Sequence, residues 1–141
     1  MLKHLARLII VVVGVIMLGF AVAPAAHAGS YCVPFTQICI SGYIENNSSY
    51  QIGVVGDGQN GPSTYAVLTQ GQTTVDLKNQ GILYDADFVY STYYVIYDLR
   101  ANPTCPSRVC NPLTFIKVGG GEAAEIVNSA GDYGYLEIRD R

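Results

Sequence analysis

Histidine is nearly absent from this sequence, and its absence excludes several classes of enzyme. Both histidines, His4 and His27, lie within segment 1–28, and segment 29–141 contains none. Without histidine there is no Ser-His-Asp triad, no Cys-His pair and no imidazole ligand for zinc, copper or iron. Acid–base catalysis would have to rely on carboxylates, two lysines and hydroxyl groups, so an enzyme is the least favoured functional class.

Positive charge is also scarce once the N-terminal segment is set aside. Residues 29–141 keep six basic side chains against eleven acidic ones, for a formal net charge of −5. They contain no cluster of lysine and arginine, which argues against nucleic acid or an anionic membrane surface as partner. The segment "GGGE" at 119–122 lacks the Gly-Lys-Ser/Thr sequence of a phosphate-binding loop. We therefore predict no cofactor and no metal.

Segment 1–28 has the pattern of a secretory signal peptide. Lys3 and Arg7 precede an uninterrupted apolar run over 8–23, and the small-residue sequence Ala26-His27-Ala28 follows it. This pattern predicts export and cleavage after Ala28. A retained membrane anchor is the alternative, although the run is shorter than the roughly 20 residues that span a bilayer. We expect residues 29–141 to form one secreted domain without membrane contact.

Four cysteines remain in the predicted mature chain, an even number that indicates disulfides in an exported protein. A zinc site is less favoured, because the spacings do not match paired zinc ligands. Pairing between neighbours needs only local turns, which nearby prolines help to form, whereas crossed pairing would close a much longer loop. The favoured pairs are Cys32 with Cys39 and Cys105 with Cys110.

Short runs of β-branched and aromatic residues, separated by turn clusters, predict an all-β fold. We expect a hairpin over 37–55, a loop over 56–63, and strands over 64–69, 73–77, 113–118 and 135–139. Segment 86–99 is either one long central strand or two strands that meet near 91–92, and 122–128 is a strand or a short helix. The predicted architecture is a single-domain antiparallel β-sandwich, or a closed barrel, of about eight short strands cross-linked by two disulfides.

Tyrosine is abundant, and all eleven tyrosines follow the predicted signal peptide. Tyr90, Tyr93, Tyr94 and Tyr97 are candidate binding residues, because tyrosine gives a large contact area at low entropic cost. Strand formation alone is the other explanation for their number. The leading hypothesis is an exported binding protein whose partner is an extracellular protein or a glycan.

Arg108 supports a second hypothesis, that of a protease inhibitor or toxin-like effector. It lies between Cys105 and Cys110, and an exposed arginine in an extended loop would suit a trypsin-like pocket. The extended chain between these cysteines would span roughly 17 Å, whereas bonded cysteines need Cα atoms within about 7 Å. The bait loop therefore requires the crossed disulfide pairing.

Asp85 and Asp87 support a third hypothesis, that of a carboxylate-dependent hydrolase. If the segment is extended, the two side chains share a face at a spacing of roughly 7 Å, which overlaps the separations in glycosidase carboxylate pairs. The alternative is that both aspartates lie in a solvated turn before a strand. Residues 57–61, "DGQNG", resemble a calcium loop but lack its full pattern.

Overall fold

The computed structural model describes residues 31–101, 104–130 and 134–141. The predicted signal peptide, residues 1–28, lies outside these residues. Within the described residues, no helix is both long enough and apolar enough to cross a membrane.

The described residues are mostly strands, with one short α-helix and one 3₁₀ turn. The helical elements are α2 (Thr74–Asn79) and η1 (Pro106–Arg108). The strands are β1 (Tyr31–Cys32), β2 (Cys39–Ile40), β3 (Gly42–Asn46), β4 (Ile52–Gly58), β5 (Gly61–Leu68), β6 (Phe88–Tyr90), β7 (Ile96–Asp98), β8 (Val109–Cys110), β9 (Ile116–Lys117), β10 (Glu122–Asn128) and β11 (Leu136–Asp140).

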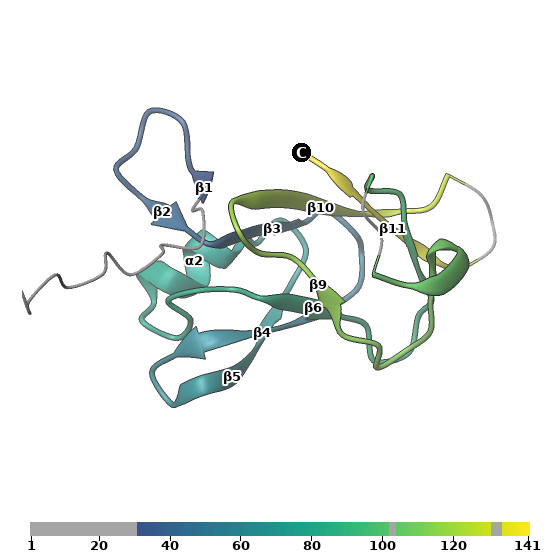
Figure 1. The fold of residues 1–141 in the computed structure, drawn as a ribbon, viewed down its shortest axis with the longest axis horizontal. Helices are drawn as coiled ribbons and strands as arrows, with labels where there is room; N and C mark the ends of the chain where they lie inside the picture. Colours follow the sequence, from purple (N-terminus) through teal and green to yellow (C-terminus); the bar gives the residue numbers. More distant parts are fainter. Residues whose placement is uncertain (1–30, 102–103, 131–133) are drawn as a thin grey trace, which may run out of the picture.

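Two sheets form the body of the protein in a sandwich-like arrangement (Figure 1). One has the strand order β3-β10-β11-β7-β8, the other has the order β5-β4-β6-β9, and β1 and β2 form a separate ribbon. Both sheets end in edge strands, so the predicted alternative of a closed barrel is wrong. The predicted number of about eight strands is also wrong, because the described residues form eleven. The purely antiparallel arrangement is also wrong, because β10 pairs with β3, and β11 with β7, in parallel.

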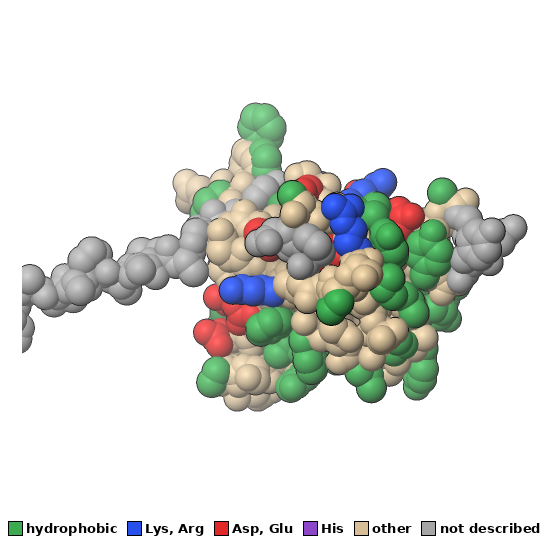
Figure 2. All heavy atoms as spheres, turned by 45° about the vertical axis from the view of Figure 1, so that its right-hand side comes forward, with side chains coloured by type: hydrophobic (Ala, Val, Ile, Leu, Met, Phe, Trp, Pro, Cys, Tyr) green, Lys and Arg blue, Asp and Glu red, His purple; other side chains and the backbone are tan. Residues whose placement is uncertain are grey.

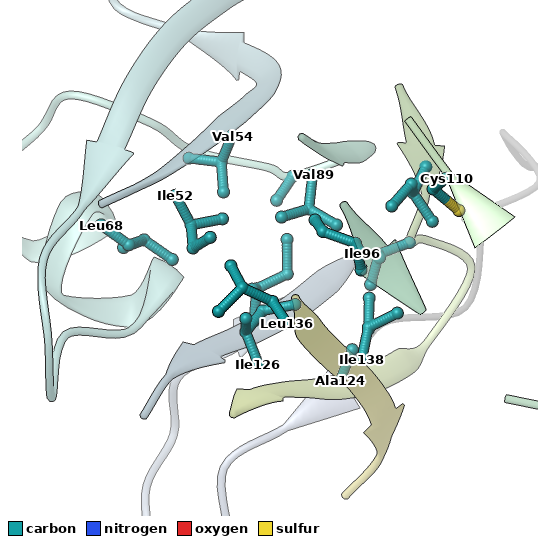
Figure 3. Packing of buried hydrophobic residues seen from close by; sticks show 14 of the residues in the cluster. Ile52, Val54, Leu68, Val89, Ile96, Cys110, Ala124, Ile126, Leu136 and Ile138 are labelled. Atoms are coloured by element: carbon teal, nitrogen blue, oxygen red, sulfur yellow. The ribbon is translucent and has the colours of Figure 1, made fainter. Parts of the chain in front are cut away.

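The core lies between the two sheets and is built from one side chain in two along each strand (Figure 3). Ile52 and Val54 of β4 face Ile126 of β10 and Ile138 of β11, and all four are fully buried. Neighbouring residues in a strand point to opposite faces. The residues next to Val54 in β4 and those next to Val89 in β6 are therefore directed to the outer face of the second sheet.

Several predicted elements differ from the structure because pairing partners are chosen by distant residues. Residues 37–55 do not form a hairpin: β3 pairs with β10, and β4 pairs with β5 and β6. The predicted loop 56–63 contains the end of β4, a turn and the start of β5, with Gly58 opposite Gly61. For segment 86–99 the structure has the second of the two predicted alternatives, two strands, and these strands, β6 and β7, belong to different sheets.

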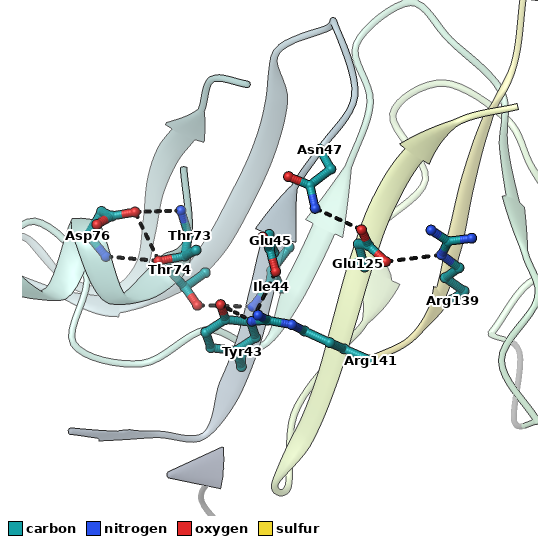
Figure 4. Close-up of polar contacts among 10 residues, drawn as sticks. All are labelled: Tyr43, Ile44, Glu45, Asn47, Thr73, Thr74, Asp76, Glu125, Arg139 and Arg141. Atoms are coloured by element: carbon teal, nitrogen blue, oxygen red, sulfur yellow. Dashed lines mark hydrogen bonds and ion pairs between the residues drawn. The ribbon is translucent and has the colours of Figure 1, made fainter. Parts of the chain in front are cut away.

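Residues 73–77, predicted as a strand, instead form the N-terminal cap and first part of helix α2 (Figure 4). The cap explains why a helix forms here. The Asp76 carboxylate accepts a hydrogen bond from the Thr73 N–H at 2.7 Å, and the Asp76 N–H donates to the Thr73 hydroxyl at 3.3 Å. This reciprocal capping box satisfies backbone donors that a helix start leaves open. Residues 122–128, in contrast, form strand β10 and not a helix.

Candidate binding surface

The outer face of the sheet β5-β4-β6-β9 carries most of its aromatic side chains. Val55 of β4 lies between Tyr65 of β5 and Phe88 of β6, and Gly53 of β4 lies beside Tyr90 of β6. Residues that pair directly share a face of the sheet. Lys117 pairs with Phe88, so alternation along β9 places Phe115 on this face too.

Four rings on this face touch one another, and we call Tyr65, Phe88, Tyr90 and Phe115 the aromatic platform. The Phe115 ring centroid lies 5.2 Å from that of Tyr90 and 6.4 Å from those of Tyr65 and Phe88. The rings are inclined to one another by 60–76°, geometries that are favourable between aromatic rings. Figure 2 shows hydrophobic side chains gathered along the lower side of the molecule, where Figure 1 places β4 and β5.

A glycine makes room for the platform. A Cβ at Gly53 would lie 2.2 Å from Cζ of Tyr90, so the Tyr90 ring rests directly on the backbone of β4. Beside it, Val55, Ser63, Tyr65, Phe88 and Phe115 line a pocket of about 200 Å³. The platform thus combines two exposed rings, Tyr65 and Phe115, and two half-buried rings with a small pocket whose floor is Val55, a side chain only 6% exposed.

The lining of this pocket is mostly apolar. It offers aromatic and aliphatic carbon atoms and the hydroxyl groups of Ser63 and Tyr65. Such a surface accepts an apolar or aromatic group and orients it through few polar contacts.

Comparisons of the chain with protein-family models, with curated proteins and with solved structures find no match. Function is therefore inferred from the geometry of the described residues.

The four tyrosines that the sequence offers as candidate binding residues do not lie together. Tyr90 belongs to the platform, whereas the Tyr94 ring lies 3.9 Å from that of Tyr50 and packs against the core. Tyr97 lies on β7 of the other sheet, 6.2 Å from the Tyr135 ring. Tyr93 is 84% exposed in the turn between β6 and β7.

Three platform residues, Tyr65, Phe88 and Phe115, are not among the site residues predicted from the sequence. Alternation within 63–67 and 88–90 could have placed Tyr65 on one face of its strand, and Phe88 with Tyr90 on one face of theirs. Their meeting depends on the register of β4 with β5 and β6, which no local pattern encodes.

The arginine loop has the shape of a closed turn. Cys105 is bonded to Cys110 and Cys32 to Cys39, the neighbour pairing that the sequence favours. Between Cys105 and Cys110 the chain makes the turn η1, in which Ser107 and Arg108 have φ of 57° and 61°. Arg108 is exposed, but residues 106–108 lack the extended backbone that a bait loop presents to a protease.

The two candidate catalytic carboxylates lie in the loop before β6. Burial raises the pKa of Asp85, and the Asp57 charge adds to this, while Asp85 also accepts a hydrogen bond from the Ser41 hydroxyl. Burial likewise raises the pKa of Asp87, and the charges of Asp85 and Asp57 raise it further. Among the described residues, no cluster of acidic, cysteine or histidine side chains could hold a metal ion.

Replacement of Asp87 by asparagine is expected to stabilise the protein at neutral pH. The folded state binds the Asp87 proton more tightly than the unfolded chain does. The free energy of unfolding of the wild-type protein therefore falls as pH rises from the ordinary pKa of the carboxyl through its raised pKa. Thermal unfolding of both proteins should show a gain for Asp87→Asn at about pH 7 that vanishes near pH 3. An equal difference at both pH values would contradict this assignment.

Proposed function

We propose that the protein is an exported binding protein whose aromatic platform receives an apolar or aromatic side chain of an extracellular protein partner. The observation that carries the proposal is the contact of four rings, three of which line a pocket on the outer face of a sheet. The two disulfides fit an oxidising, extracellular location.

The exposure of the platform supports a binding role over a purely structural one. Tyr65 and Phe115 are 61% and 48% exposed, although the protein has an apolar core built from other side chains. Contiguous exposed aromatic side chains mark interaction sites, and tyrosine and phenylalanine are enriched there.

The pocket lining favours a protein side chain over a glycan. A sugar ring stacks on an aromatic face but also needs polar groups for its hydroxyls, whereas Val55, Phe88 and Phe115 offer only carbon. Ser63 and Tyr65 alone supply hydroxyl groups in the lining. An aromatic or large aliphatic side chain of the partner, surrounded by backbone contacts, fits this composition. Such a side chain resembles the buried anchor residues that dominate the energy of protein interfaces.

Selection of a displayed peptide library on the exported protein tests the proposal. We expect the selected peptides to share an aromatic or large aliphatic residue, and Phe115→Ala to weaken their binding by about tenfold or more, because Phe115 contacts all three other rings. Tyr93→Ala is the matched control: it removes an exposed aromatic side chain outside the platform and should leave binding unchanged.

Two outcomes would overturn the proposal. One is selected peptides that bind Phe115→Ala as well as wild type but lose affinity with Tyr93→Ala. The other is binding of a panel of mono- and oligosaccharides that depends on Phe115, together with no peptide binding, which would assign the platform to glycans.

A further inference from the structure

Among the described residues, one edge of the two sheets is long and open. The edge strands are β3, β8, β5 and β9, of which β8 and β9 have two residues each. The free side of β3 is covered, since the Ile44 N–H donates to the Thr74 hydroxyl and that hydroxyl donates to the Gly42 carbonyl. β5 has eight residues and pairs along its length with β4 alone.

The regular part of the open edge of β5, residues 64–68, lacks the features that keep edge strands from pairing. Pro62 and the positive φ of Ser63, 65°, interrupt only the first part of β5. Residues 64–68 pair regularly with 52–56, and the whole strand carries no charged side chain. An uncharged, regular edge strand exposes unpaired N–H and C=O groups and is a template for another strand.

We propose that the other strand is β5 of a second copy of this chain, paired antiparallel about a two-fold axis at Ala66. In this register Tyr65 lies opposite the partner subunit's Val67, and Val67 lies opposite the partner subunit's Tyr65. The interaction is isologous and therefore closes at two copies.

The sequence of β5 is complementary to itself in this register. Aromatic and β-branched side chains, such as those of Tyr65 and Val67, form favourable cross-strand pairs. No like charges meet, because the strand has none. Tyr65 and Val67, which are 61% and 48% exposed, would each contact a side chain of the other copy.

Pairing would join two four-stranded sheets into one sheet of eight strands. Each copy keeps its own aromatic platform, so the dimer presents two platforms on one continuous sheet. Two platforms per particle would increase avidity for a partner that displays its anchor repeatedly. The proposal goes beyond the binding role of the platform and stands without it.

The molar mass of the exported protein, measured by light scattering after size exclusion across a dilution series, tests the pairing. We expect a dimer that dissociates on dilution. Val67→Lys should raise the dissociation constant by about tenfold or more, because lysine on an edge strand opposes pairing. Val67→Thr keeps a β-branched, uncharged side chain and should stay within about threefold of wild type.

Val109→Lys is the matched control, because Val109 lies on the edge strand β8 of the other sheet and is 41% exposed. It should leave the mass of the dimer unchanged. A monomeric wild-type protein, a dimer unaffected by Val67→Lys, or equal dissociation by both lysine variants would each overturn the proposal.

Hydrogen exchange gives a second readout that needs no variant. Backbone amides within 64–68 should exchange more slowly as the wild-type concentration rises through the dimer transition. Exchange of these amides that does not change with concentration would contradict the pairing. Phe115→Ala should keep the dimer mass, so failure of the platform and failure of the pairing give different results.

Discussion

Replacement of Asp98 by alanine is expected to lower the free energy of unfolding by about 3–5 kcal/mol, because it leaves a buried guanidinium without its partner. Asp98 is fully buried and Arg100 is 5% exposed. Asp98 Oδ1 accepts from Arg100 Nε at 2.9 Å, and Oδ2 accepts from Arg100 Nη2 at 2.8 Å. The Arg100 N–H also donates to Oδ1 at 3.1 Å, so the carboxylate satisfies three donors.

The second carboxylate near Arg100 provides the control for this experiment. Glu122 is 3.4 Å from Arg100 Nη1 and its side chain is 48% exposed. Exposed ion pairs contribute little, so Glu122→Gln should cost less than about 1 kcal/mol. Urea unfolding of both variants measures the difference. Equal losses, or a loss below about 1 kcal/mol for Asp98→Ala, would show that Arg100 is not buried against Asp98.

Replacement of Gly42 by alanine is expected to destabilise the protein by about 3 kcal/mol, at the upper end for an overpacked site. A Cβ at Gly42 would lie 2.1 Å from the Ala86 carbonyl oxygen and 2.6 Å from that of Val118. Both obstacles are backbone atoms in segments that flank β6 and β9, so neither can rotate away. The close approach of β3 to these segments depends on the absence of a side chain.

Gly119→Ala is the matched control, because the nearest atoms to its Cβ are 3.9 Å away, at ordinary contact distance. We expect a change within about 0.5 kcal/mol for this variant. Thermal unfolding of the two alanine variants compares them directly. Equal stability of the Gly42 and Gly119 variants would contradict the packing of β3 against the second sheet.

Local sequence patterns predict the strand content of this protein but not its pairing. The run "YQIGVV" alternates and forms most of β4, and the composition of 86–90 suits β6. The parallel pairing of Ala124 with Ile44 joins segments that lie far apart in the sequence, and the choice of partner is a property of the packed core. Thr73 and Asp76 show the opposite case, since a local cap overrides the strand preference of the residues around it.

The candidate site was less predictable than the fold, because its residues come from separate strands. Tyr65, Tyr90 and Phe115 lie far apart in the sequence and meet only through the order β5-β4-β6-β9. Segment 90–97 stands out in the sequence because tyrosines are concentrated there. The structure divides that segment between two sheets, so Tyr90 and Tyr97 serve different surfaces.

The binding role of the aromatic platform is tested most directly by NMR titration of the exported protein with N-acetyl-phenylalanine amide, a mimic of a single aromatic anchor. We expect shift changes in the ring signals of Tyr65, Tyr90 and Phe115 of the wild type, and no changes at Tyr65 and Tyr90 in Phe115→Ala. Changes centred on Tyr93 or Tyr97, or changes that persist in Phe115→Ala, would show that the platform is not the binding surface.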